Sequence, residues 1–302
     1  MKYLKLYEKF RLIKESISGK KLILFSGPSA SGKTYLATNT KSTLSKKFKH
    51  WYEDLNSNEI LIGTDTFMGG KNTPALYTLM ENYGLKKYTE IAKGFPDNPW
   101  LIEVFDKDLY KKFISEASEE ELKIWNEMNS QVKYDKTKCT GSIKNREDGR
   151  VCGMAWVAYL HPAKTVIFDD VDTAIKNYFL DLHDILCFTP FEEYLSNIKL
   201  RINSSNPEER INVDDTGSGI YQYMKWFKAV ESESNSLDKK FYTYQAAKEM
   251  LENTGYNKSE EILSMIGVAK DSSGFYIGKK ENVKCNQIIN TRDEASVSSA
   301  EI

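Results

Sequence analysis

The stretch "LILFSGPSASGKTYLA", residues 22–37, decides the fold. It begins as an apolar run, passes through a turn that contains two glycines, and continues as a lysine, a hydroxyl residue and a helical pattern. A short apolar run that ends at a turn is typical of a buried strand. Residues 27–34, named here the glycine loop, are therefore predicted to join a strand to a helix that runs from about Lys33 to Lys47.

The glycine loop fits the pattern G-x-x-x-x-G-K-[ST]. Its glycines let backbone N–H groups turn around an anion, and the following helix directs its positive end to the same place. We expect Lys33 to reach the β- and γ-phosphates of ATP and the Thr34 hydroxyl to bind Mg²⁺. The short pattern also occurs by chance, but here a strand-like run precedes it and a helix-like run follows it. The predicted nucleotide-binding residues are Gly27, Pro28, Ser29, Ala30, Ser31, Gly32, Lys33 and Thr34.

Two aspartates follow another apolar run, "TVIFDDVD", residues 165–172. The carboxyl ends of parallel strands gather at one edge of a sheet, which is also where a phosphate-binding loop lies. A carboxylate at that edge can complete the shell of a Mg²⁺ ion. Asp169 and Asp170 are therefore candidate metal residues; their alternative role is to cap a turn or a helix.

A third aspartate, Asp65, lies just beyond a predicted strand in "LIGTDTFMGG", residues 61–70. A carboxylate in this position can accept a proton from an acceptor hydroxyl. It can equally serve as a turn or N-cap residue. The spacing alone does not decide between a catalytic base and a cap.

The rest of the chain predicts an α/β fold with a mostly parallel central sheet flanked by helices and with large helical insertions. The expected strands are residues 21–26, 59–65, 164–170, 183–189 and 286–291. We interpret residues 1–302 as a single domain built around the glycine loop. It has an N-terminal helix (1–18), an acceptor-side insertion (70–148) and a lid or helical insertion (203–283), with helices near 240–253 and 258–266.

Composition excludes several other classes of protein. The net charge of −1 gives no strong nucleic-acid signal, and no run of 18 apolar residues indicates a membrane span. The four cysteines are scattered, which favours reduced thiols and argues against a zinc site. A charged N-terminal stretch is unlike a signal peptide. We therefore expect a cytoplasmic protein, or one exported to the cytosol of another cell by a route without a readable signal.

Four segments together resemble the chloramphenicol phosphotransferase-like branch of the P-loop kinases, relatives of the zeta-toxin kinases. They are "LILFSGPSASGKTYLA", "IGTDTFMGG", "KTVIFDDVD" with "ILCFTPFEEYLSNIKLR", and "CNQIINTRDEASVSSAEI". The resemblance covers about half of the chain. It implies a kinase that uses ATP and Mg²⁺, with Asp65 as the catalytic base.

The chain also departs from that family. Residues 70–148 and 203–283 are longer than small kinases of this branch need, and these regions would hold the acceptor, so the substrate does not carry over. The family has an arginine-rich lid, whereas here only Arg201 and Arg210 lie in the matching region. Either arginine can clamp the transferring phosphate. The alternative is a solvated arginine at a helix end.

A second resemblance is to the tRNA dimethylallyltransferases, whose loop reads "GPTASGKT" and whose next strand ends in an aspartate. Those enzymes use the loop for a prenyl pyrophosphate and are usually basic along an RNA channel. This chain is nearly neutral, and "VIFDDV" and "CFTPFEEYL" fit the kinase pattern better.

The sequence therefore predicts an ATP-dependent phosphotransferase that moves the γ-phosphate to an acceptor hydroxyl. Asp65, Lys33, Arg201 and Arg210 are its predicted catalytic residues, and Thr34, Asp169 and Asp170 its predicted metal residues. The acceptor is open: a small molecule, a nucleotide sugar, a nucleic-acid end or a protein. Transfer of a nucleotidyl group, prenyl transfer and a non-catalytic nucleotide-binding interaction protein are the alternatives.

Overall fold

The structure is a computed structural model. It describes residues 19–38, 48–63, 72–94, 106–131, 146–169, 174–179, 182–206, 210–213 and 219–300. The predicted N-terminal helix (1–18), Asp65 and Asp170 lie outside these described residues.

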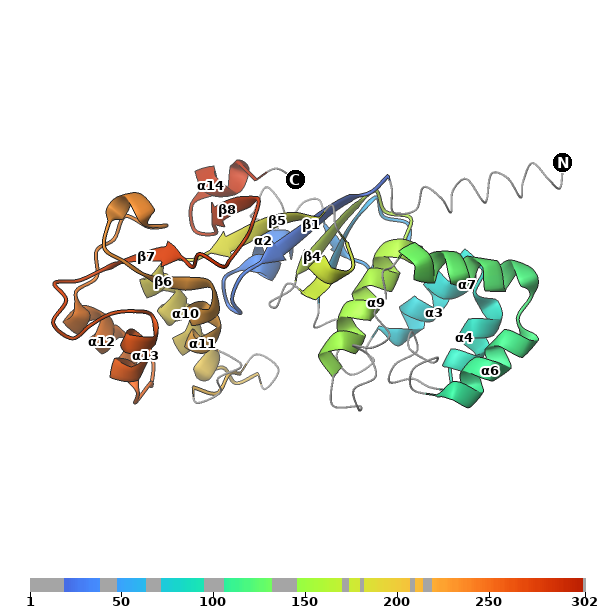
Figure 1. The fold of residues 1–302 in the computed structure, drawn as a ribbon, viewed down its shortest axis with the longest axis horizontal. Coiled ribbons are helices and arrows are strands. Elements are labelled where there is room, and N and C mark those ends of the chain that lie inside the picture. Colours follow the sequence, from blue (N-terminus) through green and yellow to red (C-terminus); the bar gives the residue numbers. More distant parts are fainter. Residues whose placement is uncertain are drawn as a thin grey trace. The chain divides into compact units, whose positions relative to one another are not determined.

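A six-stranded sheet forms the centre of the fold, which confirms the predicted α/β class (Figure 1). The pairs β2–β3, β3–β4 and β5–β8 are parallel. The short edge strand β2 was not predicted, because two residues are too few to show a pattern. In spatial order the strands are β2 (Lys49–His50), β3 (Glu59–Gly63), β4 (Thr165–Asp169), β1 (Lys21–Ser26), β5 (His183–Phe188) and β8 (Gln287–Asn290).

The inner strands are continuous apolar runs. β1 buries every residue after Lys21, and β3 and β4 each bury their three central residues. A strand that is covered on both faces has no polar side to alternate with, so it is uniformly apolar. The apolar runs therefore identify the strands of the sheet, and the turns after them mark the carboxyl ends of these strands.

The chain divides into two compact units. Unit 1 consists of residues 1–24 and 45–183, and unit 2 of residues 25–44 and 184–302. Unit 1 contains the whole of the predicted acceptor-side insertion, residues 70–148. Its helices are α3 (Thr73–Tyr83), α4 (Lys86–Ala92), α6 (Lys107–Glu116), α7 (Glu119–Gln131), α9 (Arg146–Leu160) and the 3₁₀ turn η2 (Ala174–Asn177).

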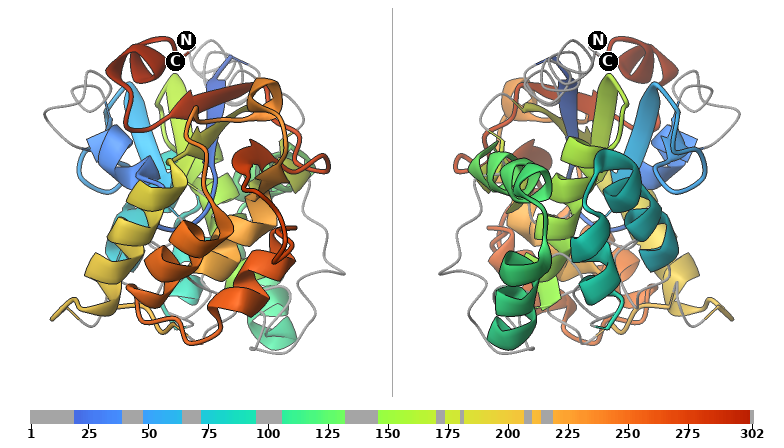
Figure 2. Two further views of the ribbon diagram at one scale, coloured as in Figure 1. Left: turned by 90° about the vertical axis from the view of Figure 1, so that its left-hand side faces the viewer. Right: turned by 90° about the vertical axis from the view of Figure 1, so that its right-hand side faces the viewer.

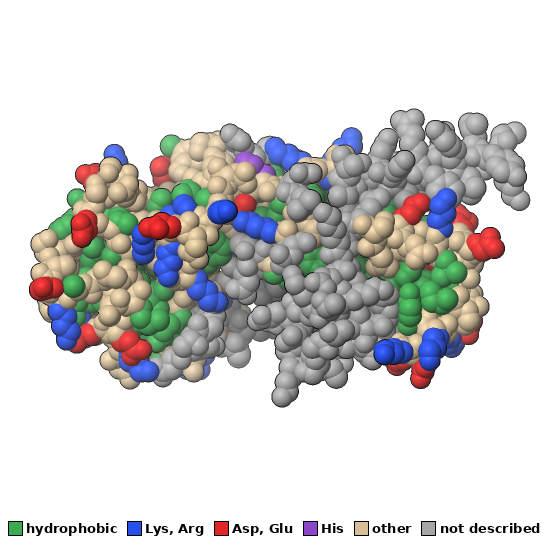
Figure 3. Space-filling view, viewed as in Figure 1, with side chains coloured by type: hydrophobic (Ala, Val, Ile, Leu, Met, Phe, Trp, Pro, Cys, Tyr) green, Lys and Arg blue, Asp and Glu red, His purple; other side chains and the backbone are tan. Residues whose placement is uncertain are grey.

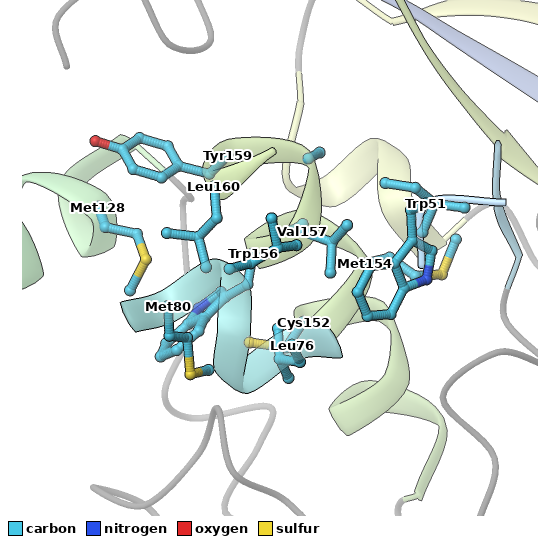
Figure 4. Packing of buried hydrophobic residues seen from close by; sticks show 14 of the residues in the cluster. Trp51, Leu76, Met80, Met128, Cys152, Met154, Trp156, Val157, Tyr159 and Leu160 are labelled. Carbon is cyan, nitrogen blue, oxygen red and sulfur yellow. The ribbon is translucent and has the colours of Figure 1, made fainter. Parts of the chain in front are cut away.

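Aromatic packing holds the helices of unit 1 together. Trp156 on α9 lies edge-on to Trp125 on α7, with ring centroids 5.1 Å apart, and Trp125 stacks on Tyr88 of α4 at 4.3 Å. All three rings are buried. Figure 4 shows α9 and α3 facing one another through Trp156 and Met80. The described helices of the 70–148 region, α3, α4, α6 and α7, therefore contribute to a hydrophobic core.

Unit 2 carries the glycine loop and a second hydrophobic core. Figure 2, left, shows α10 (gold) beside α12 and α13 (orange). Helices α12 and α13 match the predictions for 240–253 and 258–266. Its other elements are α2 (Lys33–Thr38), α10 (Phe191–Ile202), α11 (Ile220–Trp226), β6 (Phe227–Val230), η3 (Glu233–Asn235), α12 (Tyr244–Glu252), α13 (Ser259–Met265), β7 (Tyr276–Lys279) and α14 (Glu294–Ser298).

The predicted helical insertion at 203–283 also contains an antiparallel strand pair, which the sequence did not reveal. Val230 of β6 pairs with Tyr276 of β7, about 46 residues further along the chain. Each strand has only four residues, which is too short for a clear alternation of apolar and polar side chains. The pair is held by a contact between distant segments, and local patterns do not encode such a contact.

The described surface is mixed in charge. On the face drawn in Figure 3, lysine and arginine side chains are interspersed with aspartate and glutamate. Among the described residues, no helix is both long and apolar enough to cross a membrane.

Candidate active site

The backbone of the glycine loop adopts dihedral angles that few amino acids other than glycine tolerate. Gly27 has φ +133° and Gly32 has φ +84°, and Ala30 between them adopts φ +66°, which is unusual for a residue with a side chain. A Cβ at Gly27 would lie 2.7 Å from the Cys187 carbonyl oxygen. Gly27 is therefore required both by its dihedral angle and by the close approach of β5.

Five consecutive carbonyl groups of the loop accept hydrogen bonds from side chains. Lys33 Nζ donates to the carbonyls of Gly27 (3.0 Å) and Pro28 (2.9 Å). The next three are held, in order, by the Tyr194 hydroxyl on Ser29 (2.8 Å), the Asn197 amide on Ala30 (3.2 Å) and the Thr189 hydroxyl on Ser31 (3.0 Å).

This arrangement fixes where the loop's donors point. In a planar trans peptide the N–H is opposite the C=O, so a carbonyl held by a side chain turns the following N–H away from that side chain. The backbone N–H groups of Ser29, Ala30 and Gly32 donate to no described residue. The donors of Ala30 and Gly32 follow the carbonyls that Tyr194 and Thr189 hold, so they are directed away from these supporting side chains, as an anion-binding loop requires.

Helix α10 supplies most of this support from one face. Tyr194, Asn197 and Arg201 are spaced by three and four residues, so their side chains lie along one side of the helix. The Arg201 guanidinium donates to the Ser29 hydroxyl at 2.8 Å. The helix therefore holds two loop carbonyls and presents a fixed positive charge at the loop.

Tyr194 is fully buried and serves only as a hydrogen-bond donor or acceptor. Burial raises the pKa of its hydroxyl well above the ordinary value of 10, although Arg201 opposes this shift. The hydroxyl lies within hydrogen-bond distance of two carbonyls, that of Ser29 and that of Gly219 (3.0 Å). Gly219 directly precedes α11, so Tyr194 ties the loop to the start of that helix.

The C-terminal segment of the chain supports the loop from the other side. The Thr291 hydroxyl lies 2.8 Å from that of Thr189, which holds the Ser31 carbonyl. Arg292 donates to the Asn197 side-chain oxygen at 2.9 Å and forms an ion pair with Glu193 at 3.3 Å. Because Arg292 occupies the amide oxygen of Asn197, the amide nitrogen is turned toward Ala30.

A buried polar pair lies directly before the loop. Ser26, the last residue of β1, donates from its hydroxyl to the Asp184 carboxylate at 2.5 Å, and both residues are buried. The backbone N–H of Asp184 donates to the side chain of Asn286. This network connects the end of β1 to β5 and to the segment before β8, and so anchors the strand that carries the loop.

The predicted site residues have different outcomes. The structure brings Lys33 and Arg201 into contact with the loop. Arg210 does not join them: it is exposed and lines a separate cavity of about 570 Å³ with Ile202 and Ile211. Thr34 is the second residue of α2 and is exposed, and its role toward Mg²⁺ stays a prediction.

The predicted acidic residues belong to other parts of the chain. Asp169 is the last residue of β4 in unit 1, and the strand register pairs it with Gly63 at the end of β3. Its role toward the loop stays a prediction. Asp65 and Asp170 lie outside the described residues, two positions after Gly63 and one after Asp169.

Sequence reasoning missed the residues that hold the loop carbonyls, Thr189, Tyr194 and Asn197, and the two that support them, Thr291 and Arg292. Tyr194 and Asn197 lie in the segment "CFTPFEEYLSNIKLR", seven and four residues before Arg201. That spacing was a usable signal, because one helical face that contains an arginine also presents the residues four and seven positions earlier. Thr291 and Arg292 come from a segment almost 100 residues further on and left no local signal.

The donor set suits a polyphosphate with Mg²⁺. Mg²⁺ usually takes only one or two protein ligands and completes its shell with phosphate oxygens and water. The described residues contain no cluster of three or more metal-binding side chains, so a metal held by protein groups alone does not fit them. A hydroxyl such as Thr34 beside a loop of backbone donors fits the shared arrangement of metal and phosphate.

No protein-family model, curated protein or solved structure matches this chain.

Proposed function

We propose that the protein is an ATP-dependent phosphotransferase that moves the γ-phosphate of ATP to an acceptor hydroxyl. The observation that carries the proposal is the glycine loop itself: the side chains of Tyr194, Asn197 and Thr189 tie back three carbonyls, while the N–H groups of Ala30 and Gly32 are left to donate. A loop with this polarity binds anions and repels cations. The motif and the strand before it favour a nucleotide polyphosphate over a single phosphate.

In this proposal the loop residues bind and orient the nucleotide. The backbone donors of the loop hold the phosphates, and the Lys33 amine exchanges its Gly27 and Pro28 carbonyls for phosphate oxygens. Such an exchange keeps the buried amine hydrogen-bonded throughout. Thr34 and a carboxylate of the Asp169–Asp170 pair would hold Mg²⁺, which neutralises charge that develops on the phosphates.

Arg201 and Asp65 are assigned to the transfer step. Arg201 contacts the loop at Ser29, and from this position its guanidinium can pair with the negative charge of the transferring phosphoryl group. Asp65 would accept the proton of the acceptor hydroxyl as its oxygen bonds to the γ-phosphorus and the bond to the β–γ bridging oxygen breaks. The released products are the phosphorylated acceptor and ADP.

Calorimetric titration tests the binding half of the proposal. The full chain should bind ATP with Mg²⁺ more tightly than it binds dimethylallyl pyrophosphate, and Lys33→Ala should weaken ATP binding sharply. Lys199→Ala, an exposed lysine on α10, is the matched control and should bind like the wild type. Preference for the prenyl pyrophosphate would favour a prenyltransferase, and unchanged ATP affinity in Lys33→Ala would refute nucleotide binding at the loop.

A further inference from the structure

A cavity of about 540 Å³ lies in unit 1, where the end of α9 meets the residues just before β1. Its lining includes the buried side chains of Leu79, Tyr159 and Leu160 and the exposed side chains of Asn56, Asn82 and Lys164. Figure 4 shows the Tyr159 ring extending from the end of α9 on the side away from Trp51. None of the described lining residues belongs to the glycine loop, so this cavity is independent of the proposed nucleotide site.

The cationic group of the cavity is Lys20. Its amine donates to the carbonyl oxygens of Ala158, at 2.8 Å, and of His161, both at the C-terminal end of α9. An ammonium group has three N–H donors, and the third has no acceptor among the described residues. In its protonated form Lys20 therefore has one donor left for a ligand.

The cavity holds no counter-charge for Lys20. Among the described residues that line it, none is acidic. The His161 side chain is buried, accepts from the Ala163 N–H through Nδ1 and donates from Nε2 to the Asp54 carbonyl, so it is the neutral tautomer. Burial lowers the pKa of His161 to about 4, which keeps it neutral. Lys164, at the rim, adds a second positive charge.

Burial also acts on Lys20 itself. It lowers the pKa of the amine from 10.5 to about 7, and no charged partner offsets the effect. An amine in this state gains a proton when an anion is placed beside it, because the ion pair stabilises the charged form.

We propose that this cavity binds a small molecule that has an apolar body and one carboxylate, with the carboxylate paired to Lys20. The apolar body would lie on the partly exposed side chains of Leu55 and Tyr83, and the exposed amides of Asn56 and Asn82 would border the entrance. A monoanion matches the single buried cation.

A purely structural role for Lys20 makes a different prediction. Lysine side chains often satisfy the last carbonyls of a helix, and the contacts with Ala158 and His161 are of this kind. A lysine that only caps α9 would show no preference for carboxylates and no linked protonation. The two roles can thus be separated by following protons as well as binding.

The test is a calorimetric titration of the full chain with 4-phenylbutyrate and with its neutral amide, at pH 8, in buffers of different ionisation enthalpy. We expect the carboxylate to bind about tenfold more tightly than the amide, the difference that a charge-assisted hydrogen bond makes. Binding of the carboxylate should be accompanied by the uptake of about one proton, because Lys20 is mostly neutral at this pH. Binding of the amide should be accompanied by no proton uptake.

Lys20→Met tests the residue, and Lys107→Met, an exposed lysine on α6, is the matched control. Lys20→Met should bind both compounds alike without proton uptake, whereas Lys107→Met should behave like the wild type. If Lys20→Met does not fold, the proton uptake of the wild type decides the question alone. Equal binding of acid and amide by the wild type, or no binding of either at about 10 mM, would overturn the proposal.

Discussion

The hydroxyl of Tyr194 on α10 donates to the Ser29 carbonyl in the glycine loop at 2.8 Å, from a ring that is fully buried. The same hydroxyl lies 3.0 Å from the Gly219 carbonyl before α11. A hydroxyl has one hydrogen for these two acceptors, so Tyr194 couples the orientation of the loop to the start of α11.

Tyr194→Phe should weaken ATP binding about tenfold, because the buried Ser29 carbonyl loses its donor and can rotate toward the phosphates. The phenyl ring keeps its packing, 4.5 Å from the ring of Tyr223. Calorimetry measures the affinity. Tyr223→Phe is the control, since its hydroxyl reaches only the Thr189 carbonyl at 3.4 Å, and it should leave the affinity nearly unchanged. Equal effects of the two variants would show that general packing, and not the loop carbonyl, is responsible.

Substitutions of Arg201 and of Arg210 should have clearly different effects on the rate of phosphoryl transfer. Arg201→Ala removes a charged donor beside Ser29, and we expect phosphoryl transfer to slow by about 10²-fold or more, as for other lost transition-state donors. Arg201→Lys should restore only part of the rate because an ammonium lacks the planar fork. Arg210→Ala should transfer at the wild-type rate. A larger loss of transfer rate for Arg210→Ala than for Arg201→Ala would assign the phosphate-clamping role to Arg210.

The turn at Gly27 should be intolerant of any side chain. Gly27→Ala places a methyl group 2.7 Å from the Cys187 carbonyl and also forces φ +133° on alanine. Gly267→Ala is the control: φ is +94°, but nothing lies within 4 Å of the new methyl group. In urea denaturation the control should lose about 1–2 kcal/mol from dihedral strain alone, and Gly27→Ala should lose clearly more. Similar losses of stability in the two variants would mean that β5 can shift to make room for the new methyl group.

His161 should make folding stability depend on pH. Burial and the nearby Lys20 lower its pKa to about 4 from 6.5, although the contact with the Asp54 carbonyl opposes them. Between these two values the unfolded chain binds more protons, so the free energy of unfolding falls as the pH drops through this window. The contribution is at most about 1.4 kcal/mol per pH unit.

The check is urea denaturation at several pH values between 4.5 and 7. His161→Gln keeps one donor and one acceptor but does not titrate, so its stability should fall less steeply with acid than that of the wild type. Parallel curves for the two proteins would contradict the assignment of a neutral, buried imidazole.

Much of the fold could be predicted because its strands are uniformly apolar and end in turns. Strands β1, β3, β4, β5 and β8 were expected within one or two residues of their observed bounds. The pair β6–β7 was missed, since Val230 and Tyr276 are brought together by the chain between them and not by a local pattern.

The candidate site divides in the same way. The glycine loop was evident from its own residues, and Lys33 and Arg201 contact it, while their roles toward a phosphate stay predictions. Asn197 and Arg292 were not identified, because their contact joins segments 95 residues apart and neither residue has a chemistry that stands out alone. Arg201 and Arg210 were equivalent in the sequence, and only the direction of the α10 face distinguishes them.

The most direct test of the central claim follows the label from ATP into an acceptor. The full chain is incubated with Mg²⁺, fractionated cell extract and ATP labelled at either the γ- or the α-phosphate, beside Asp65→Asn and Lys33→Ala variants. We predict that γ-label, and not α-label, moves to a component other than water. Asp65→Asn should bind ATP normally but transfer about 10²–10⁴-fold more slowly, the usual effect of losing a positioned base. Transfer of the α-label, or tight ATP binding with no transfer to any fraction, would contradict the phosphotransferase account.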